Sequence, residues 1–94
     1  MRLFLFWPYP DMYIVYILYS SSLNKYYIGS TSNLPERLRK HNTKHKGFTG
    51  GPSDWEVAFM EKYERKEDAL KREKQIKAWK SRIMIERLIS SAGS

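Results

Sequence analysis

The chain has 94 residues, 41% of them hydrophobic, a formal net charge of +7 and no cysteine. This length suits one domain, the apolar content excludes a disordered chain, and the missing cysteines exclude disulfides and thiolate metal sites. No apolar run approaches the roughly 20 residues of a membrane span, so we expect no membrane partner, and the positive charge favours nucleic acid instead.

Residues 1–12 are expected to form a flexible N-terminal extension. Their apolar stretch looks like a signal peptide, but Pro8 and Pro10 interrupt it and no small-residue cleavage site follows. Met12, just before the first expected strand, is an alternative start. The absence of cysteine fits a reducing compartment, and we expect the protein in the cytoplasm.

Two strands come next, and together they predict an antiparallel hairpin. The β-branched and aromatic run Tyr13–Tyr19 is typical of a buried strand, and a serine-rich turn connects it to a second strand at Lys25–Ser30. Strand alternation places Tyr16 on one face of the first strand, and Tyr27 and Gly29 together on one face of the second.

The first helix is expected from about Leu34 to His45. Asn33 is a good N-cap and Pro35 suits a first helical turn. At about 100° per residue, the apolar stripe of this helix includes His41, with Arg37 at its edge. Both side chains are therefore expected on the side that faces the core.

A third strand and two further helices complete the predicted fold. The strand covers Trp55–Met60, with Val57 and Phe59 on one side. One helix starts near Lys66, and another covers residues 81–90 after a bend. The order β-β-α-β-α-α predicts a single small α/β domain of the α+β type over residues 13–90, with a three-stranded, mainly antiparallel sheet flanked by helices and a frayed end at 91–94.

Five residues are expected to converge on one small pocket suited to phosphodiester chemistry. Glu73 lies between apolar positions of its helix, so its carboxylate needs a partner or a metal ion. Arg37 and His41 are one helical turn apart, where arginine can grip a phosphate and histidine can transfer a proton. Tyr16 and Tyr27 are candidate proton acceptors, provided that a nearby charge lowers the pKa of the phenol.

Each of these residues also has an ordinary structural interpretation. Glu73 is surrounded by basic residues and can form a surface pair with one of them. Arg37 and His41 can simply pack at a helix face. The tyrosines can be ordinary strand residues, because tyrosine is common in strands and this chain has seven. Periodicity alone leaves both interpretations open.

Two tripeptides in the hairpin add a further signal. They are Ile14-Val-Tyr16 and, after a gap of ten residues, Tyr27-Ile-Gly29. The pair resembles the motifs that give the GIY-YIG nuclease superfamily its name, with Ile14 in place of the first glycine. Gly29 closes the second motif, where a residue without Cβ suits a close approach to the backbone.

The segments that follow the hairpin strengthen the resemblance. Residues 30–42 place arginine and histidine one turn apart, and Ala69–Lys77 has the pattern Ala-Leu-x-x-Glu-x-x-x-Lys. The similarity covers roughly Tyr13 to Ile89. It is greatest to small stand-alone bacterial members, and the nuclease domain of the excision-repair protein UvrC is a more distant relative.

The resemblance implies a role for each candidate residue. Tyr16 and Tyr27 stand at the two motif tyrosines. Arg37 matches the arginine that holds the scissile phosphate, and His41 matches a histidine found in many members. Glu73 matches the ligand of a single divalent ion, which we expect to be Mg²⁺ or Mn²⁺ and to be weakly held without DNA.

The resulting prediction is a metal-dependent DNA endonuclease with a role in repair or recombination. Water attacks phosphorus, with Tyr16 as the first choice of proton acceptor and Tyr27 or His41 assisting. A basic flank is expected to bind the nucleic acid: Arg39, Lys40, Lys44, Lys46, Lys74, Lys77 and Lys80. The alternative is a nucleic-acid-binding module on the same fold with little or no cleavage. RNA is a further candidate partner, and we expect a monomer or a weak dimer.

Overall fold

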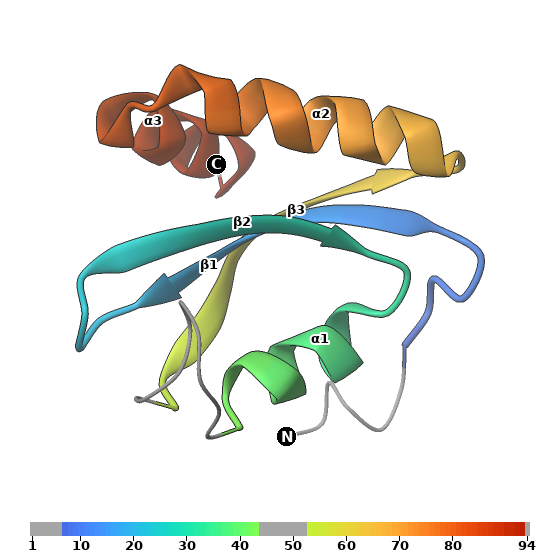
Figure 1. The fold of residues 1–94 in the computed structure, drawn as a ribbon, viewed down its shortest axis with the longest axis horizontal. Coiled ribbons are helices and arrows are strands. Elements are labelled where there is room, and N and C mark those ends of the chain that lie inside the picture. Colours follow the sequence, from blue (N-terminus) through green and yellow to red (C-terminus); the bar gives the residue numbers. More distant parts are fainter. Residues whose placement is uncertain (1–6, 44–52, 94) are drawn as a thin grey trace.

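The computed structural model describes residues 7–43 and 53–93. Within these ranges the elements follow in the order β1 (Tyr13–Ser20), β2 (Lys25–Thr31), α1 (Leu34–His41), β3 (Trp55–Tyr63), α2 (Lys66–Trp79) and α3 (Arg82–Gly93). The strands form one antiparallel sheet in the order β2-β1-β3. The predicted α+β class and element order are therefore confirmed (Figure 1).

β1 is the central strand, and both of its faces are covered. The side chains from Ile14 to Leu18 are all 0% exposed, which explains why the strand is apolar at successive positions rather than at alternate ones. Its register with β2 pairs Tyr16 with Gly29 and Leu18 with Tyr27. Cross-strand partners share a face of the sheet, so these tyrosines and the motif glycine lie on one face.

Helices cover the two faces of the sheet in separate layers. α1 packs on the face that carries Tyr16, and Leu34 and Leu38 are buried there. α2 and α3 pack on the opposite face, where Ala69 and Ile76 are buried. Figure 1 shows α1 below the sheet and the other two helices above it. Residues on α1 and α2 can therefore meet only around an edge of the sheet.

β3 departs from the predicted alternation. Its register with β1 shifts, because Ile17 pairs with Phe59 whereas Leu18 pairs with Val57. Neighbouring residues of β1 face opposite ways, so Val57 and Phe59 lie on opposite faces. The prediction that they share a side was wrong, because alternation alone does not reveal the extra residue of a β-bulge, Ala58.

α1 is shorter than expected. Asn33 caps its start by accepting a hydrogen bond from the amide of Glu36 at 3.1 Å. The helix ends at His41, and the expected end at residue 45 is corrected. The physical reason lies in Asn42, whose side chain bonds to the backbone amide and carbonyl of Trp55 at 2.9 and 3.0 Å and so joins the end of α1 to the start of β3.

The chain turns between α2 and α3 at Lys80. This residue takes a left-handed conformation, with φ 48° and ψ 38°. Ser81 then accepts a hydrogen bond from the amide of Met84 at 3.2 Å, which caps α3. α3 continues to Gly93, beyond the expected end at residue 90. No helix in the described ranges is long and apolar enough to cross a membrane.

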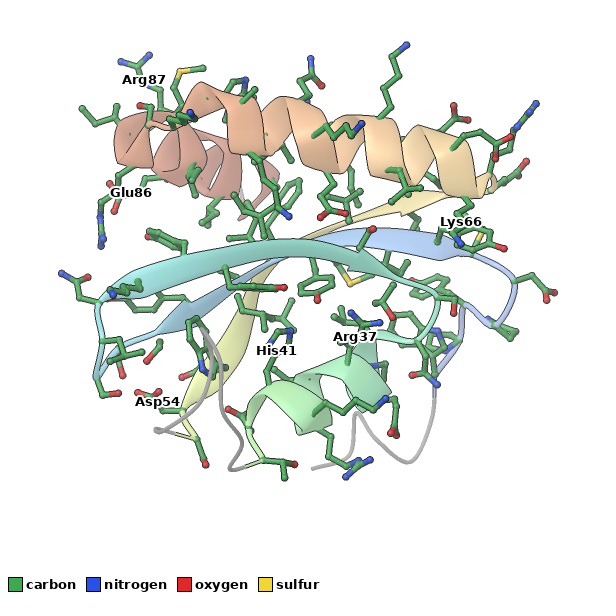
Figure 2. All side chains as sticks on the ribbon, in the orientation of Figure 1. Arg37, His41, Asp54, Lys66, Glu86 and Arg87 are labelled. Carbon is green, nitrogen blue, oxygen red and sulfur yellow. The ribbon has the colours of Figure 1, made fainter. Side chains whose placement is uncertain are left out.

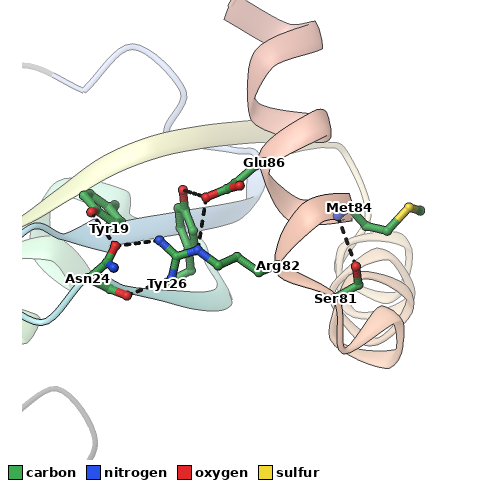
Figure 3. Close-up of polar contacts among 7 residues, drawn as sticks. All are labelled: Tyr19, Asn24, Tyr26, Ser81, Arg82, Met84 and Glu86. Atoms are coloured by element: carbon green, nitrogen blue, oxygen red, sulfur yellow. Dashed lines mark hydrogen bonds and ion pairs between the residues drawn. The ribbon is translucent and has the colours of Figure 1, made fainter.

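A polar network joins α3 to the turn between β1 and β2. Arg82 donates to the carbonyl and the side-chain oxygen of Asn24 at 2.8 and 2.6 Å, and it pairs with Glu86 at 3.1 Å. The hydroxyl of Tyr26 donates to Glu86 at 3.2 Å, as Figure 3 shows. The position of α3 is thus set by charge-assisted bonds as well as by apolar packing.

Residues 7–12 lie against the domain. Trp7 and Met12 pack on the apolar cluster beneath the sheet, and the ammonium of Lys62 lies 4.5 Å from the ring centre of Tyr9. This part of the expected extension therefore has contacts with the folded chain. Residues 1–6 lie outside the described ranges.

Candidate active site

Two tyrosines and a histidine form a cluster beneath the sheet. The hydroxyl of Tyr16 lies 3.2 Å from Nε2 of His41, and the ring centres of Tyr27 and His41 are 4.6 Å apart. Tyr16 is 0% exposed and His41 is 8% exposed, whereas Tyr27 on the edge strand is only partly buried. Tyr27 is therefore the member of the cluster that solvent reaches most easily.

Gly29 leaves the space that the ring of Tyr16 occupies. A Cβ atom at this position would lie 2.6 Å from the hydroxyl of Tyr16 and 2.8 Å from its Cζ. The ring is buried and close-packed, so it has no free volume into which to move. The structure thus shows the close approach expected at this glycine, and the approaching group is the motif tyrosine itself.

The phenol of Tyr16 is held in its neutral form. Burial raises the pKa of Tyr16 to about 12, and the positive charge of Arg37 offsets this only in part. A group that accepts a proton at neutral pH needs a pKa closer to that pH. Tyr16 is therefore poorly suited to be the first proton acceptor, and its hydroxyl instead bonds to His41.

Arg37 lies at the boundary between this cluster and solvent. The residue is exposed on α1, and its charge reaches Tyr16. Its side chain lines a cleft of about 210 Å³ at the end of β2. An arginine in this position can bind a phosphate from solvent with its planar fork while its field acts on the buried tyrosine.

Glu73 lies on α2, in the helical layer above the sheet. Its two oxygens accept hydrogen bonds from the hydroxyl of Ser30 at 2.6 Å and the ammonium of Lys77 at 2.7 Å, and its side chain is 17% exposed. Burial raises the pKa of Glu73, but these two bonds and the charges of Lys77 and Arg37 outweigh burial, so the pKa is lowered. The carboxylate is ionised at neutral pH. It forms the expected surface pair with a lysine, Lys77, and at the same time accepts a hydrogen bond from Ser30 of β2.

The five expected residues come from elements on both faces of the sheet, and their convergence on one pocket stays a prediction. Figure 2 shows Arg37 and His41 on α1 below the sheet, whereas Glu73 lies above it. Strand alternation is the reason: Gly29 faces the cluster below, and the next residue, Ser30, faces Glu73 above. The two groups still interact through their charges around the edge strand, because Glu73 acts on the pKa of Tyr16 and Arg37 acts on both.

Glu73 is the carboxylate on which a divalent ion could bind. Among the described residues, no group of three or more histidine, cysteine or acidic side chains could hold a metal ion. Glu73 is ionised, and its partner Lys77 is 51% exposed and therefore able to turn away. Mg²⁺ typically uses one or two carboxylates together with substrate phosphates and water, so the donor set fits an ion that arrives with its substrate.

The basic residues expected on α1 have mixed surroundings. Arg39 and Lys40 are exposed, and Arg39 is paired with Glu36 at 2.6 Å. Lys44 and Lys46 lie outside the described residues. The part of the expected flank on α1 therefore presents Lys40 and a partly neutralised Arg39.

The basic residues expected on α2 lie in the other layer. Lys74 is exposed, and Lys77 and Lys80 line a groove beside β2. Two further cations, Lys25 and Arg82, line the same groove, and the sequence did not single them out. The five described members of the expected flank are thus divided between the two helix layers, with Arg39 and Lys40 on α1 and the other three on or directly after α2.

Two polar residues of the site were missed from the sequence. Ser30 directly follows the second tripeptide, and alternation from Gly29 is a signal that would have pointed it toward the later helices. Lys66 lines the cleft together with Arg37, and Figure 2 shows it at the start of α2. The sequence offers no signal that distinguishes Lys66 from the rest of the 17 lysines and arginines.

The class of protein follows from this geometry together with a comparison of families. A model of the GIY-YIG catalytic domain matches residues 12–87, a range that includes β1 through α2 and all five expected site residues. The matched model describes a catalytic domain and covers more than half of the chain. It belongs to the GIY-YIG family, as the two tripeptides of the hairpin indicated.

A curated relative matches part of the chain. Structure-specific endonuclease subunit SLX1 of Phaeosphaeria nodorum is 48% identical over 58 residues, which cover 56% of this chain. The matched region is 16% of that protein, so the chain spans only a small part of the relative's length. No solved structure matches the chain. The relation to bacterial members and to UvrC stays a prediction.

Proposed function

We propose that this protein is a divalent-metal-dependent endonuclease that hydrolyses phosphodiester bonds in DNA. The observation that carries the proposal is Glu73, an ionised carboxylate bonded to the edge strand through Ser30 and within electrostatic reach of Arg37. Membership of the GIY-YIG family supports the nuclease class. The name of the relative, a structure-specific endonuclease subunit, supports a substrate selected by its shape rather than its sequence.

The proposed mechanism divides the work among four residues. Arg37 holds the scissile phosphate and neutralises the charge that develops on its oxygens. Glu73 would hold the divalent ion, which when bound supplies Lewis-acid stabilisation of the leaving oxygen. Tyr27 accepts the proton of the attacking water, because it is more accessible than the buried Tyr16. His41 contacts the ring of Tyr27 and can relay that proton.

Cleavage of a labelled panel tests the proposed function. The panel contains single-stranded, duplex and branched DNA and single-stranded RNA, each with Mg²⁺, with Mn²⁺ and with EDTA. We expect Glu73→Gln and Arg37→Ala to lower the cleavage rate by roughly 10²–10³-fold or more, because each removes a charge that acts on the transition state. Glu67→Gln is the matched control, since Glu67 is an exposed carboxylate on the same helix and pairs with Arg65.

The outcomes separate the proposal from its alternatives. Metal-dependent cleavage by the wild type and Glu67→Gln, with loss in both site variants and unchanged circular dichroism, supports it. Full cleavage by both site variants, or by the wild type in EDTA, contradicts it. Binding without cleavage under every metal condition supports the second candidate function, a nucleic-acid-binding module, which the basic groove beside β2 favours. A repair or recombination role and a cytoplasmic location stay predictions.

A further inference from the structure

The cleft beside Arg37 has the composition of a site for an anion. Its lining combines two cations, Arg37 and Lys66, with three consecutive hydroxyl residues: Ser30, Thr31 and Ser32. Tyr13 and Ala69 complete the wall. No carboxylate is among these lining residues of the described chain. Two positive charges and hydroxyl donors in about 210 Å³ match the needs of a phosphate group.

Lys66 is the residue of this cleft that the proposed mechanism does not use. It is exposed at the first position of α2, and its ammonium forms no hydrogen bond or ion pair with any described residue. Other basic residues of this helix layer are engaged: Arg65 pairs with Glu67 and Arg72 with Glu61. The ammonium of Lys66 thus remains available for a ligand.

The acidic neighbours of Lys66 do not close the cleft. Glu67 is bonded to Arg65 at 3.1 Å, and Asp68 lines a different hollow together with Arg72. The exposed Ser32 makes no hydrogen bond within the described residues, so its hydroxyl is a free donor on the side of the cleft formed by the end of β2. A cation on α2 and a hydroxyl donor at the end of β2 therefore border the same space.

We propose that this cleft binds a second phosphate of the nucleic-acid backbone, the one that neighbours the scissile phosphate on the cleaved strand. This proposal rests on the nuclease function stated above. Arg37 binds the scissile phosphate from the α1 side of the cleft, and Lys66 on α2 with Ser32 after β2 binds the neighbouring phosphate. Two adjacent contacts fix the direction in which the strand crosses the edge of β2, which a single contact cannot do.

Binding measured without cleavage tests this subsite. A fluorescent branched DNA is titrated in EDTA over a series of salt concentrations with the wild type, Lys66→Gln and Lys71→Gln. We expect Lys66→Gln to weaken binding by about tenfold and to reduce the slope of log K against log salt by about one, because one phosphate contact is lost. Lys71→Gln is the matched control, since Lys71 is exposed on the same helix but does not line the cleft.

Neutral phosphates identify the contacted position. Methylphosphonate linkages are placed one at a time on either side of the cleavage point, and each DNA is titrated with the wild type and Lys66→Gln. At one position next to the cleavage point, we expect the neutral linkage to weaken binding of the wild type but to cause no further loss with Lys66→Gln. The two changes are then not additive, because they remove the same contact. The subsite is overturned if the losses from the neutral linkage and from Lys66→Gln add fully at every position. It is also overturned if Lys66→Gln and Lys71→Gln have equal salt slopes. The nuclease proposal stands in both cases. If the wild type binds none of the nucleic acids, the proposed function fails as well.

Discussion

The two motif tyrosines carry the same phenol group in different environments. Tyr16 is enclosed by the sheet and α1 and bonds to His41. Tyr27 is on the edge strand and is only partly buried. Desolvation disfavours a charged phenolate, which is why the pKa of Tyr16 rises to about 12. From these environments we propose that Tyr16 has a positioning role and that Tyr27 accepts the proton.

Replacing each tyrosine with phenylalanine separates these roles. We expect Tyr27→Phe to lower the single-turnover cleavage rate by roughly 10²–10⁴-fold, the usual contribution of a general base. Tyr16→Phe removes the hydrogen bonds of a buried hydroxyl to His41 and Arg37 and should lower the rate by roughly tenfold or less. Phenylalanine keeps the ring in both variants, so thermal unfolding provides the control for folding. A larger loss in Tyr16→Phe than in Tyr27→Phe would contradict the assignment.

At the scale of the elements, α1 is fixed to the sheet at its C-terminal end by one side chain. The amide of Asn42 donates to the carbonyl of Trp55 and its oxygen accepts from the amide of Trp55. This pair of hydrogen bonds to the backbone joins the end of α1 to the start of β3. It also fixes the neighbouring His41 against the tyrosines.

Asn42→Ala should destabilise the domain by about 1–3 kcal/mol, because a partly buried amide and carbonyl lose their partner. Urea unfolding measures this free energy. Asn42→Asp keeps the acceptor for the amide of Trp55 and loses only the donor, so we expect an intermediate stability. Equal stability of Asn42→Ala and the wild type would show that water replaces both bonds without cost.

The sequence was most informative about the elements and least informative about irregular pairing. The hairpin, the third strand and α2 follow from periodicity and from β-branched and aromatic composition, which act locally. The bulge at Ala58 and the end of α1 depend on partners from another strand. The bulge places Phe59 on the face of the sheet opposite to Val57. The hydrogen bonds between Asn42 and Trp55 end α1 earlier than expected. Such long-range pairings leave no periodic signal in either segment.

At the scale of the whole molecule, the site depends on which residues meet around the edge of the sheet. The sequence predicts that Arg37 and Glu73 belong to one site, but it does not predict that the sheet separates their helices. It missed Lys66 because proximity to the end of β2 arises only once α2 is packed. Charge and motif therefore indicated the chemistry, while the arrangement of layers determined which cations surround it.

Acid stability of the whole domain depends in part on Asp54, which joins the start of β3 to the turn after β1. Hydrogen bonds from the hydroxyl of Ser20 at 2.6 Å and the amide of Ser22 at 2.8 Å lower the pKa of Asp54 to about 2. The pKa is lower in the folded chain than its ordinary value of 3.8. Ionised Asp54 therefore stabilises the fold above about pH 4, and this contribution is lost as the pH falls toward 2.

We expect Asp54→Asn to be less stable than the wild type at pH 7 and to lose less stability between pH 4 and pH 2. Urea unfolding across this pH range measures both effects. Asp68→Asn is the control, because Asp68 is exposed and accepts no hydrogen bond from a described residue. A pH dependence of Asp54→Asn equal to that of the wild type would show that other carboxylates account for the loss in acid.

The central position of β1 has a consequence during translation. β2 follows β1 directly along the chain, but β3 and the two helices above the sheet come from the later half. At a synthesis rate of roughly 5–20 residues per second, one edge of β1 and one of its apolar faces stay open for seconds. An open apolar edge is a template for pairing with another chain. We therefore expect the yield of folded protein in a cell to depend on how crowded the ribosomes are, as well as on the stability of the finished domain.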